Sequence, residues 1–414
     1  MKSFLFLFVF LLCSTFSFSQ QWSILGYSNQ RINAVAVHPQ NPNIIFCAGD
    51  NLYKSVDGGT TWDTVFLNTP FNSIYFYPEY PDTMFATLGA GSNSDGIYKS
   101  TDGGEHWANL TWIFRTTSIM IPFYPQGTML AGTLGDGVLI SSDYGQNWTP
   151  MNDSIDNMNV LSMINLYPSC IPEDPINLYL AGTHGGIFFY PEHTWLTSPD
   201  EYWHNTNMAT NAIIPAISRT NSGDKIWAAI GGGSYSDGMY YSENLGSTWL
   251  LSDYWPFITD ILINAMNSTT IYAADSGSGV KRTINDGLVW ETINNNLGDL
   301  RVHCLGQSPL DTMRLYAGTQ AGLYVYNFTA DVQNTSFKTE NVVVFPNPAN
   351  DFLNVQAYDA VIKKVEVFST NGKLQECLYP HTEHVKIQTS SFEKGIYIVR
   401  VYTENTVSTF KINR

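Results

Sequence analysis

The stretch Asn51-Leu-Tyr-Lys-Ser-Val-Asp-Gly-Gly-Thr-Thr-Trp62 decides the fold, because the chain repeats it. Two close copies follow at Gly96–Trp107 and Gly137–Trp148, and two weaker copies carry asparagine in place of the aspartate. Two more units keep only the strand. Repeats spaced by 41 to 52 residues indicate an architecture built from one supersecondary unit. The seven units begin at Asn51, Gly96, Gly137, Gly186, Gly238, Gly279 and Gly322.

Each unit contains strand patterns and no helical periodicity. A small-residue strand ending such as Ala131-Gly132-Thr133 precedes each start, and an apolar strand often closed by proline, such as Val35–Pro39, lies upstream. One repeat therefore holds four strands, and such a unit cannot bury its faces alone. We predict an all-β fold in which residues 20–332 form a single seven-bladed β-propeller.

The two ends of the repeat region complement each other. The last unit has no outermost strand after Tyr326, whereas Gln21–Leu25 resembles the strand after a repeat tryptophan and has no unit of its own. We predict that residues 21–25 pair with the last blade, which closes the ring and covers an exposed strand edge.

The intact motif Ser-x-Asp-x-Gly-x-x-Trp resembles the Asp-box, or BNR repeat, of bacterial-sialidase-like and sortilin-like propellers. The resemblance covers residues 20–332 and implies a fold, not a reaction. A turn explains the residue types, because the carboxylate accepts amide hydrogens, glycine allows positive φ and tryptophan buries a large surface between blades. We therefore interpret the boxes as structural. The intact ones are Ser55, Asp57, Gly59 and Trp62; Ser100, Asp102, Gly104 and Trp107; and Ser141, Asp143, Gly145 and Trp148.

Charge and targeting signals place the protein outside the cell. The 36 acidic and 20 basic residues give a net charge of -16, which argues against nucleic acid and anionic membrane surfaces as partners. Lys2, the apolar run Phe4–Cys13 and the small residues Ser17 and Ser19 predict a signal peptide over residues 1–19. We expect no transmembrane segment in the mature chain.

The cysteines match no zinc spacing. Cys47, Cys170, Cys304 and Cys377 follow the predicted signal peptide, and we expect buried small hydrophobes, not a disulfide framework. The eight histidines form no clustered motif, so we expect no metal and no cofactor.

A new pattern begins after a predicted linker at residues 333–340. It opens with Val344-Phe-Pro-Asn-Pro-Ala349, continues with the alternating strand and Asn-Gly turn of Lys364–Lys373, and ends with Phe392–Val401 and Phe410–Ile412. This order resembles the type A C-terminal sorting domain of proteins exported by the type IX secretion system of Bacteroidota-like bacteria. The resemblance implies a small β-sandwich over residues 341–414 that the translocon and sorting machinery recognise. It also implies removal of the domain while the passenger is released or attached to the cell surface.

Two long loops suggest a site on the propeller mouth. Gly89–Gly96 and Gly231–Gly238 share one pattern and belong to blades almost opposite each other. Asp95 and Asp237 are therefore candidates for a pair of catalytic carboxylates, with Tyr235 as a stacking surface for a sugar. Asp-Gly is equally a hairpin-turn signal, and carboxylates on widely separated rims exceed the ~10 Å that such a pair needs.

Segments between blades supply further ligand-face candidates. These are the aromatic residues Trp112 and Trp255, with Trp203 and Phe257 as further aromatics, and the arginines Arg31, Arg115 and Arg301. Aromatics beside polar turns suit a carbohydrate-binding mouth, and the same residues would suit a core between blades. Three arginines are also what sialidase chemistry needs, but Arg31-Ile32-Asn33 lacks the proline of the sialidase Arg-Ile-Pro signature and no tyrosine–glutamate pair is recognisable.

These observations favour binding over catalysis. We expect a secreted or cell-surface propeller that binds an extracellular glycan or protein partner. One alternative is a glycoside hydrolase-like enzyme that uses mouth carboxylates. The other is a protein-assembly scaffold, because Asp-box propellers resembling photosystem-assembly factors bind proteins.

Overall fold

The structure is a computed structural model. It describes residues 20–77, 80–88, 96–113, 115–122, 127–166, 177–192, 202–206, 208, 213–219, 225–231, 237–328, 341–349, 351–358, 360–369, 374–403 and 407–414. Within these ranges every regular element is a β-strand. The described residues contain no helix that is long and apolar enough to cross a membrane.

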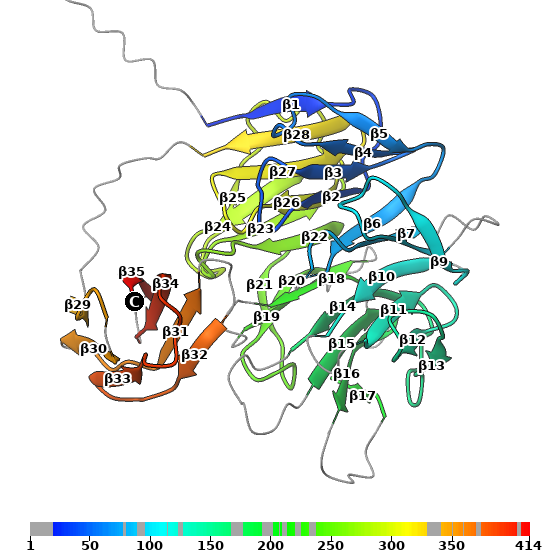
Figure 1. The fold of residues 1–414 in the computed structure, drawn as a ribbon. Helices are drawn as coiled ribbons and strands as arrows, with labels where there is room; N and C mark the ends of the chain where they lie inside the picture. The colour runs from blue at the N-terminus through cyan, green and yellow to red at the C-terminus, as the bar shows by residue number, and fades with distance from the viewer. Residues whose placement is uncertain are drawn as a thin grey trace, which may run out of the picture.

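In the described part of the chain, strands β1 to β28 form seven four-stranded antiparallel sheets, which we number as blades 1 to 7 (Figure 1). Six blades consist of four consecutive strands, and blade 7 takes its fourth strand from the N-terminus. Blade 1 is β2 (Ala34–Val37), β3 (Ile45–Ala48), β4 (Leu52–Ser55) and β5 (Asp63–Phe66); blade 2 is β6 (Phe71–Phe76), β7 (Met84–Leu88), β8 (Gly96–Ser100) and β9 (Ala108–Thr111); blade 3 is β10 (Thr116–Met120), β11 (Met129–Thr133), β12 (Val138–Ser141) and β13 (Thr149–Pro150). Blade 4 is β14 (Val160–Asn165), β15 (Asn177–Thr183), β16 (Gly186–Glu192) and β17 (His204–Asn205); blade 5 is β18 (Ile213–Arg219), β19 (Ile226–Gly231), β20 (Gly238–Ser242) and β21 (Leu250–Asp253). Blade 6 is β22 (Ile258–Ile263), β23 (Ile271–Asp275), β24 (Gly279–Thr283) and β25 (Glu291–Thr292); blade 7 is β26 (Val302–Gln307), β27 (Arg314–Thr319), β28 (Gly322–Asn327) and β1 (Trp22–Gly26).

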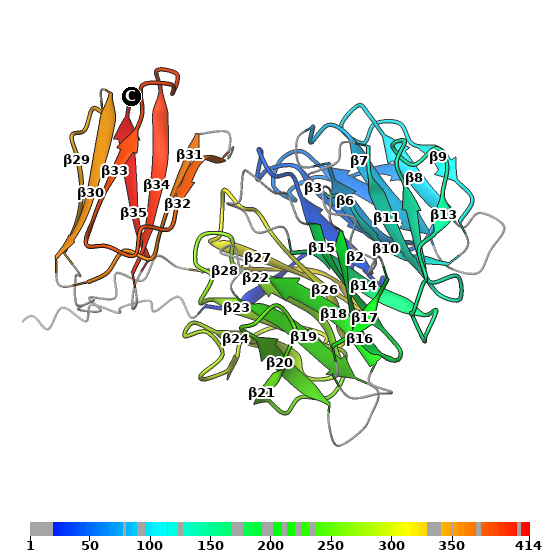
Figure 2. The same cartoon turned by 90° about the horizontal axis from the view of Figure 1, so that it is seen from below.

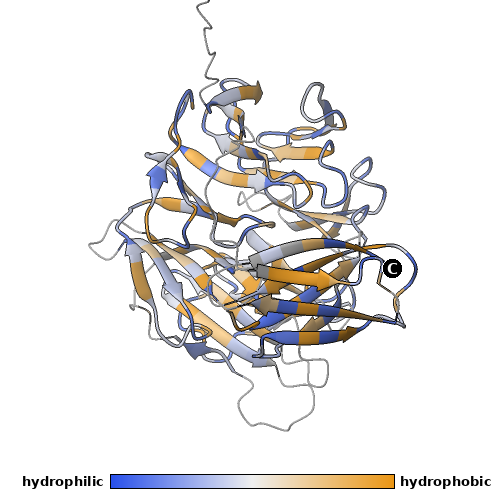
Figure 3. Ribbon diagram, turned by 90° about the vertical axis from the view of Figure 1, so that its left-hand side faces the viewer, coloured by the Kyte–Doolittle hydropathy of each residue, from blue (hydrophilic) through white to orange (hydrophobic). Residues whose placement is uncertain are grey.

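The first strands of consecutive blades contact one another around a closed ring. The contacts run from β2 through β6, β10, β14, β18, β22 and β26 and return to β2. Each pair of neighbouring blades encloses one cluster of buried hydrophobic side chains, so the core lies between blades and not inside any one of them. In Figure 3 the hydrophobic stretches lie mostly on the strands. The predicted all-β propeller is confirmed.

The predicted closure by the N-terminal strand is also confirmed. β1 pairs with β28 in antiparallel register, with Trp22 opposite Tyr326. The Trp22 side chain is buried, its indole nitrogen donates to the Ile293 carbonyl, and its ring meets that of Tyr326 edge-on at 5.2 Å. The first strand of the chain thus completes the last blade.

The ring has two chemically different faces. The turns between third and fourth strands, which contain the boxes, lie on one face, here called the box face. The hairpins between second and third strands and the connections between blades lie on the other, here called the mouth face. On the mouth face, a hairpin amide donates to the residue just before the first strand of the same blade. These pairs are Leu134 to Arg115, His184 to Asn159, Ser276 to Phe257 and Gln320 to Arg301, at 3.0 to 3.1 Å.

The remaining strands form a small β-sandwich beside the ring (Figures 1 and 2). One sheet contains β29 (Asn341–Phe345), β30 (Phe352–Tyr358) and β33 (His384–Gln388), and the other contains β32 (Leu374–Leu378), β31 (Lys364–Ser369), β34 (Ile396–Tyr402) and β35 (Val407–Asn413). Alternating apolar residues of both sheets, such as Val355 and Val399, meet in one core cluster. This is the sandwich that the sequence predicts.

The cysteines divide into two groups. Cys47 and Cys304 are free and buried in the ring, as expected for small hydrophobes. The same expectation is wrong for Cys377 on β32, which is disulfide-bonded. Cys170 lies outside the described residues.

Candidate binding face

Each intact box uses its polar atoms within its own turn. In blade 1 the Ser55 hydroxyl donates to Asp57 and accepts from the Gly59 amide, while the Asp57 carboxylate accepts from the amide and hydroxyl of Thr61. The Trp62 indole donates to the Gly59 carbonyl at 3.0 Å. The boxes of blades 2 and 3 repeat this network.

These hydrogen bonds hold the box carboxylates in the charged form. Bonds from the Thr61 side chain and amide lower the pKa of Asp57 to about 2, and bonds from the Asn147 amide and side chain lower the pKa of Asp143 to about 2. The pKa of Asp102 is lowered for the same reason, through His106. A general acid needs the opposite shift, so the geometry supports a structural role.

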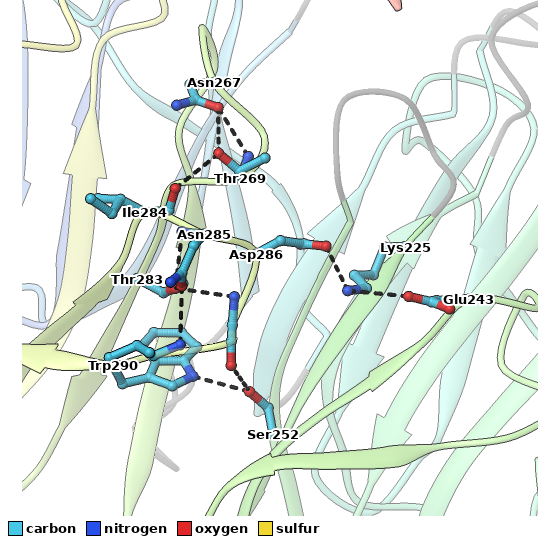
Figure 4. Close-up of polar contacts among 12 residues, drawn as sticks. Lys225, Glu243, Ser252, Asn267, Thr269, Thr283, Ile284, Asn285, Asp286 and Trp290 are labelled. Atoms are coloured by element: carbon cyan, nitrogen blue, oxygen red, sulfur yellow. Dashed lines mark hydrogen bonds and ion pairs between the residues drawn. The ribbon is translucent and has the colours of Figure 1, made fainter. Parts of the chain in front are cut away.

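The weaker box of blade 6 keeps the turn but changes its surface (Figure 4). Asn285 accepts from the Val289 amide, as the aspartates do, and the Trp290 indole reaches the Gly287 carbonyl through the Ser252 hydroxyl. Intact boxes have polar pairs where this turn has Leu288 and Val289, as Thr60 and Thr61 show in blade 1. Leu288 is 83% exposed.

A lysine joins this turn to blade 5. The Lys225 ammonium lies 2.6 Å from Asp286 and 3.3 Å from Glu243 (Figure 4). It also sits over the ring of Tyr241, 4.1 Å from the ring centre. Lys54 pairs with Glu105 across blades 1 and 2 in a similar way. The pairs Lys225–Asp286 and Lys54–Glu105 thus fasten neighbouring blades together on the box face.

The mouth face exposes large apolar side chains in several connections between blades. Five of the described connections carry at least one such residue, and three of the six residues involved are aromatic. They are Leu67, Trp112, Met158, Tyr254, Phe257 and Leu300. A broad recognition surface of this kind is what a ligand-binding propeller requires.

The three candidate arginines all lie on this face and are exposed. Arg31, Arg115 and Arg301 precede the first strands of blades 1, 3 and 7. Burial lowers the pKa of His303, and the charges of Arg31 and Arg301 lower it further. Arg31 and Arg301 thus both lie close enough to His303 for their charges to act on it, and Arg301 is paired with Asp299 at 2.6 Å.

The aromatic candidates divide sharply. Trp112 is 59% exposed and remains a ligand-face candidate. Trp255 is only 2% exposed, so its assignment as a ligand contact is wrong. Its ring fills the space between blades 5 and 6 against Trp290 and beneath the Lys281 ammonium, at 4.1 Å from the ring centre. Trp203 is buried in the same manner between blades 3 and 4.

Of the two proposed catalytic carboxylates, only that of Asp237 lies within the described residues. Asp237 is buried at the end of the blade 5 hairpin loop, directly before β20. Asp95 and Tyr235 lie outside the described residues. No separation between the two carboxylates follows from the structure.

The structure reveals mouth residues that the sequence analysis did not select. Tyr254 stands beside Trp255 and is 69% exposed. Asp275, at the end of β23, is fully buried, and Lys281 pairs with Asp253 at 3.1 Å nearby. The turn pattern Asp275-Ser-Gly-Ser278 was the only available signal, and it reads as an ordinary hairpin.

Among the described residues, no group of three or more histidine, cysteine, aspartate or glutamate side chains is arranged to hold a metal ion.

The secretion-system C-terminal sorting domain is identified by its family model, which matches residues 343–413. The chain therefore carries a propeller followed by a type IX sorting domain, which directs export to the cell surface or the surroundings. No curated protein matches the sequence.

Solved structures share the fold at low sequence identity. YCF48 from Cyanidioschyzon merolae is 17% identical with a TM-score of 0.52, and the match covers 75% of this chain and all of that one. A YCF48 bound to D1 peptide is 16% identical with a TM-score of 0.50, covering 74% and 97%. The GH74 xyloglucanase from Xanthomonas campestris is 11% identical with a TM-score of 0.58, covering 82% and 60%. At these identities the likeness concerns the fold alone.

Proposed function

We propose that this protein is a secreted or cell-surface Asp-box propeller that binds an extracellular glycan through its mouth face, without a chemical step. The exposed aromatic side chains of the connections between blades, led by Trp112 and Tyr254, carry the proposal. Aromatic rings offer sugars an apolar platform, and the surrounding hairpins supply polar groups. That a xyloglucanase shares the fold supports a glycan as the ligand.

The route to the site follows from the sorting domain. Residues 1–19 would be removed as a signal peptide, and residues 341–414 would engage the type IX translocon and then be removed. The ring of residues 20–332 would remain as the working part. Its net negative charge keeps it from nucleic acid and anionic membranes.

A second candidate function is docking of a protein partner on the box face. Blade 6 exposes Met266, Ile284, Leu288 and Val289 on that face, and the other boxes carry polar residues at the positions of Leu288 and Val289. An exposed apolar patch of this kind marks a contact site. The YCF48 structure bound to a peptide supports protein binding by this fold.

One experiment separates the two. The full-length protein is applied to a glycan array together with Trp112→Ala, a mouth variant, and Leu288→Ser, a matched box-face variant. We expect glycan binding that Trp112→Ala weakens at least fivefold and Leu288→Ser leaves unchanged. Glycan binding lost only with Leu288→Ser would move the site to the box face, and no binding to any glycan would overturn the proposal.

A further inference from the structure

Blade 6 differs from blades 3, 4 and 7 at a position that the strand register defines. Thr133, Thr183 and Thr319 end the second strands of blades 3, 4 and 7, each opposite the first paired residue of its inner strand. Asp275 holds this position in blade 6, opposite Ile258. Blade 6 therefore has a carboxylate at a position where blades 3, 4 and 7 have a hydroxyl group.

The replacement leaves a buried oxygen unpaired. Each threonine hydroxyl donates to a glycine carbonyl of its own hairpin at 2.9 to 3.0 Å. Asp275 Oδ1 accepts from the Gly277 and Ser278 amides at 2.7 and 2.6 Å, but Oδ2 has no hydrogen-bond partner among the described residues. Burial raises the pKa of this carboxyl. Buried polar atoms are nearly always paired, so an unpaired one requires an explanation.

A second departure lies directly beside the first. The residue before the inner strand is Arg115, Asn159 and Arg301 in blades 3, 4 and 7, and it is Phe257 in blade 6. Phe257 is 54% exposed at a φ of 66°, and its carbonyl accepts from the Ser276 amide. Arg115 has the same left-handed backbone at a φ of 54°, so the feature particular to blade 6 is the exposed aromatic ring at this position.

The surroundings add an aromatic platform and charged groups. Tyr254 is exposed on the same connection, and the buried Trp255 between them also has an indole nitrogen with no hydrogen-bond partner in the described chain. Lys281 packs on Trp255 and pairs with Asp253 at 3.1 Å. The connection thus carries two exposed rings, and two buried polar atoms of Trp255 and Asp275 have no hydrogen-bond partner among the described residues.

We propose that the mouth end of blade 6 is a subsite for a neutral saccharide, with Phe257 and Tyr254 stacking on the sugar and Asp275 Oδ2 accepting a hydroxyl hydrogen bond. This rests on the proposed function and names its ligand class and residues. The Lys281 ammonium faces two carboxylates, Asp253 at 3.1 Å and the buried Asp275, and this excess of acid disfavours uronates and other anions. Asp275 Oδ2 is closed from solvent in the free protein, so binding requires the Ser276–Ser278 turn to move.

The test uses substitutions taken from the other blades. Asp275→Thr restores the residue of blades 3, 4 and 7, and Phe257→Asn installs the residue of blade 4 and tolerates positive φ. Asn159→Ser is the matched control at the equivalent position of blade 4. The full-length proteins are titrated calorimetrically with cellohexaose, maltohexaose and xylohexaose, and with hexagalacturonate as the anionic comparison. Melting curves verify that each variant folds.

We expect a neutral hexasaccharide to bind, with at least a tenfold weaker Kd for Phe257→Asn and for Asp275→Thr and less than a twofold change for Asn159→Ser. Hexagalacturonate should bind at least tenfold more weakly. Wild-type affinity in Asp275→Thr would show that Asp275 only caps its turn, as the threonines do. Binding that survives both blade 6 changes but falls with Trp112→Ala would overturn this subsite and leave the proposed function standing. Absence of binding to every saccharide would overturn both.

Discussion

Replacing Trp22 by alanine tests whether the N-terminal strand holds the ring closed. The side chain is 1% exposed, its indole nitrogen donates to the Ile293 carbonyl, and its backbone amide donates to the Asn295 carbonyl at 2.8 Å. Truncating a buried tryptophan costs about 3–5 kcal/mol, because it removes apolar contact and leaves a cavity. The unpaired Ile293 carbonyl adds to the loss.

The expected shift in melting temperature follows from the size of the ring. An unfolding entropy of about 2.1 cal/mol/K per residue gives roughly 0.65 kcal/mol/K for a ring of ~310 residues. The loss of 3–5 kcal/mol then corresponds to a decrease of about 5–8 °C in Tm. All 11 tryptophans precede residue 341, so intrinsic tryptophan fluorescence follows the ring without interference from the sandwich.

Ile24→Ala on the same strand is the matched control. Ile24 is half exposed, and surface substitutions change stability by about 0.5 kcal/mol or less, which is under about 1 °C here. If Trp22→Ala melted within 2 °C of the wild-type protein, the N-terminal strand would not be stabilising the ring in solution, and the reasoning would be refuted.

Three further predictions follow from burial and pKa shifts. Asp57 and Asp143 have folded pKa values near 2, below the unfolded value, so they stabilise the ring above about pH 4 and lose this contribution as the pH falls towards 2; Asp57→Asn should flatten the acid side of a Tm-against-pH curve. Burial raises the pKa of Asp260 to about 6, so its contribution falls as the pH rises from about 4 to 6; the Tm difference between wild type and Asp260→Ser should change over that interval and be flat above it. Trp255→Ala should cost about 3–5 kcal/mol in chemical unfolding, against less than about 0.5 kcal/mol for Trp112→Ala, and equal losses would contradict the burial assigned to each.

The repeated turn made the fold predictable from sequence. A box such as Ser55–Trp62 closes its hydrogen bonds within eight residues, so its residue types are dictated locally and recur wherever the turn recurs. The partnership of β1 with β28 was predictable for a different reason. The last blade lacked its outermost strand and the N-terminal strand belonged to no blade, and exposed strand edges are disfavoured.

The mouth could not be predicted to the same depth, because it is made of connections without a fixed period. In the segment Asp253–Phe257, Tyr254 and Phe257 are exposed and Trp255 is buried. The local sequence does not indicate which of these aromatic side chains is buried. Trp255 is buried because it fills the space between blades 5 and 6 and packs against the Lys281 ammonium, and these partners come from other parts of the sequence. The burial of Asp275 depends on the same packing, so its turn-like sequence was uninformative.

The contrast between the repeated box turns and the variable mouth connections indicates where a binding site should lie. Box turns occupy their polar atoms internally, so a substitution there changes stability before it changes recognition. The residues of a mouth connection are not required to form such a turn, because the connection only joins two blades.

Function is therefore expected where one blade differs from the others at a position that packing does not explain. Blade 6 meets this criterion at Asp275 and Phe257, because blades 3, 4 and 7 have threonine at the first of these positions and arginine or asparagine at the second. Restoring the residues of the sibling blades is accordingly a sharper test than alanine, because it removes what is particular to blade 6 and keeps what the fold requires.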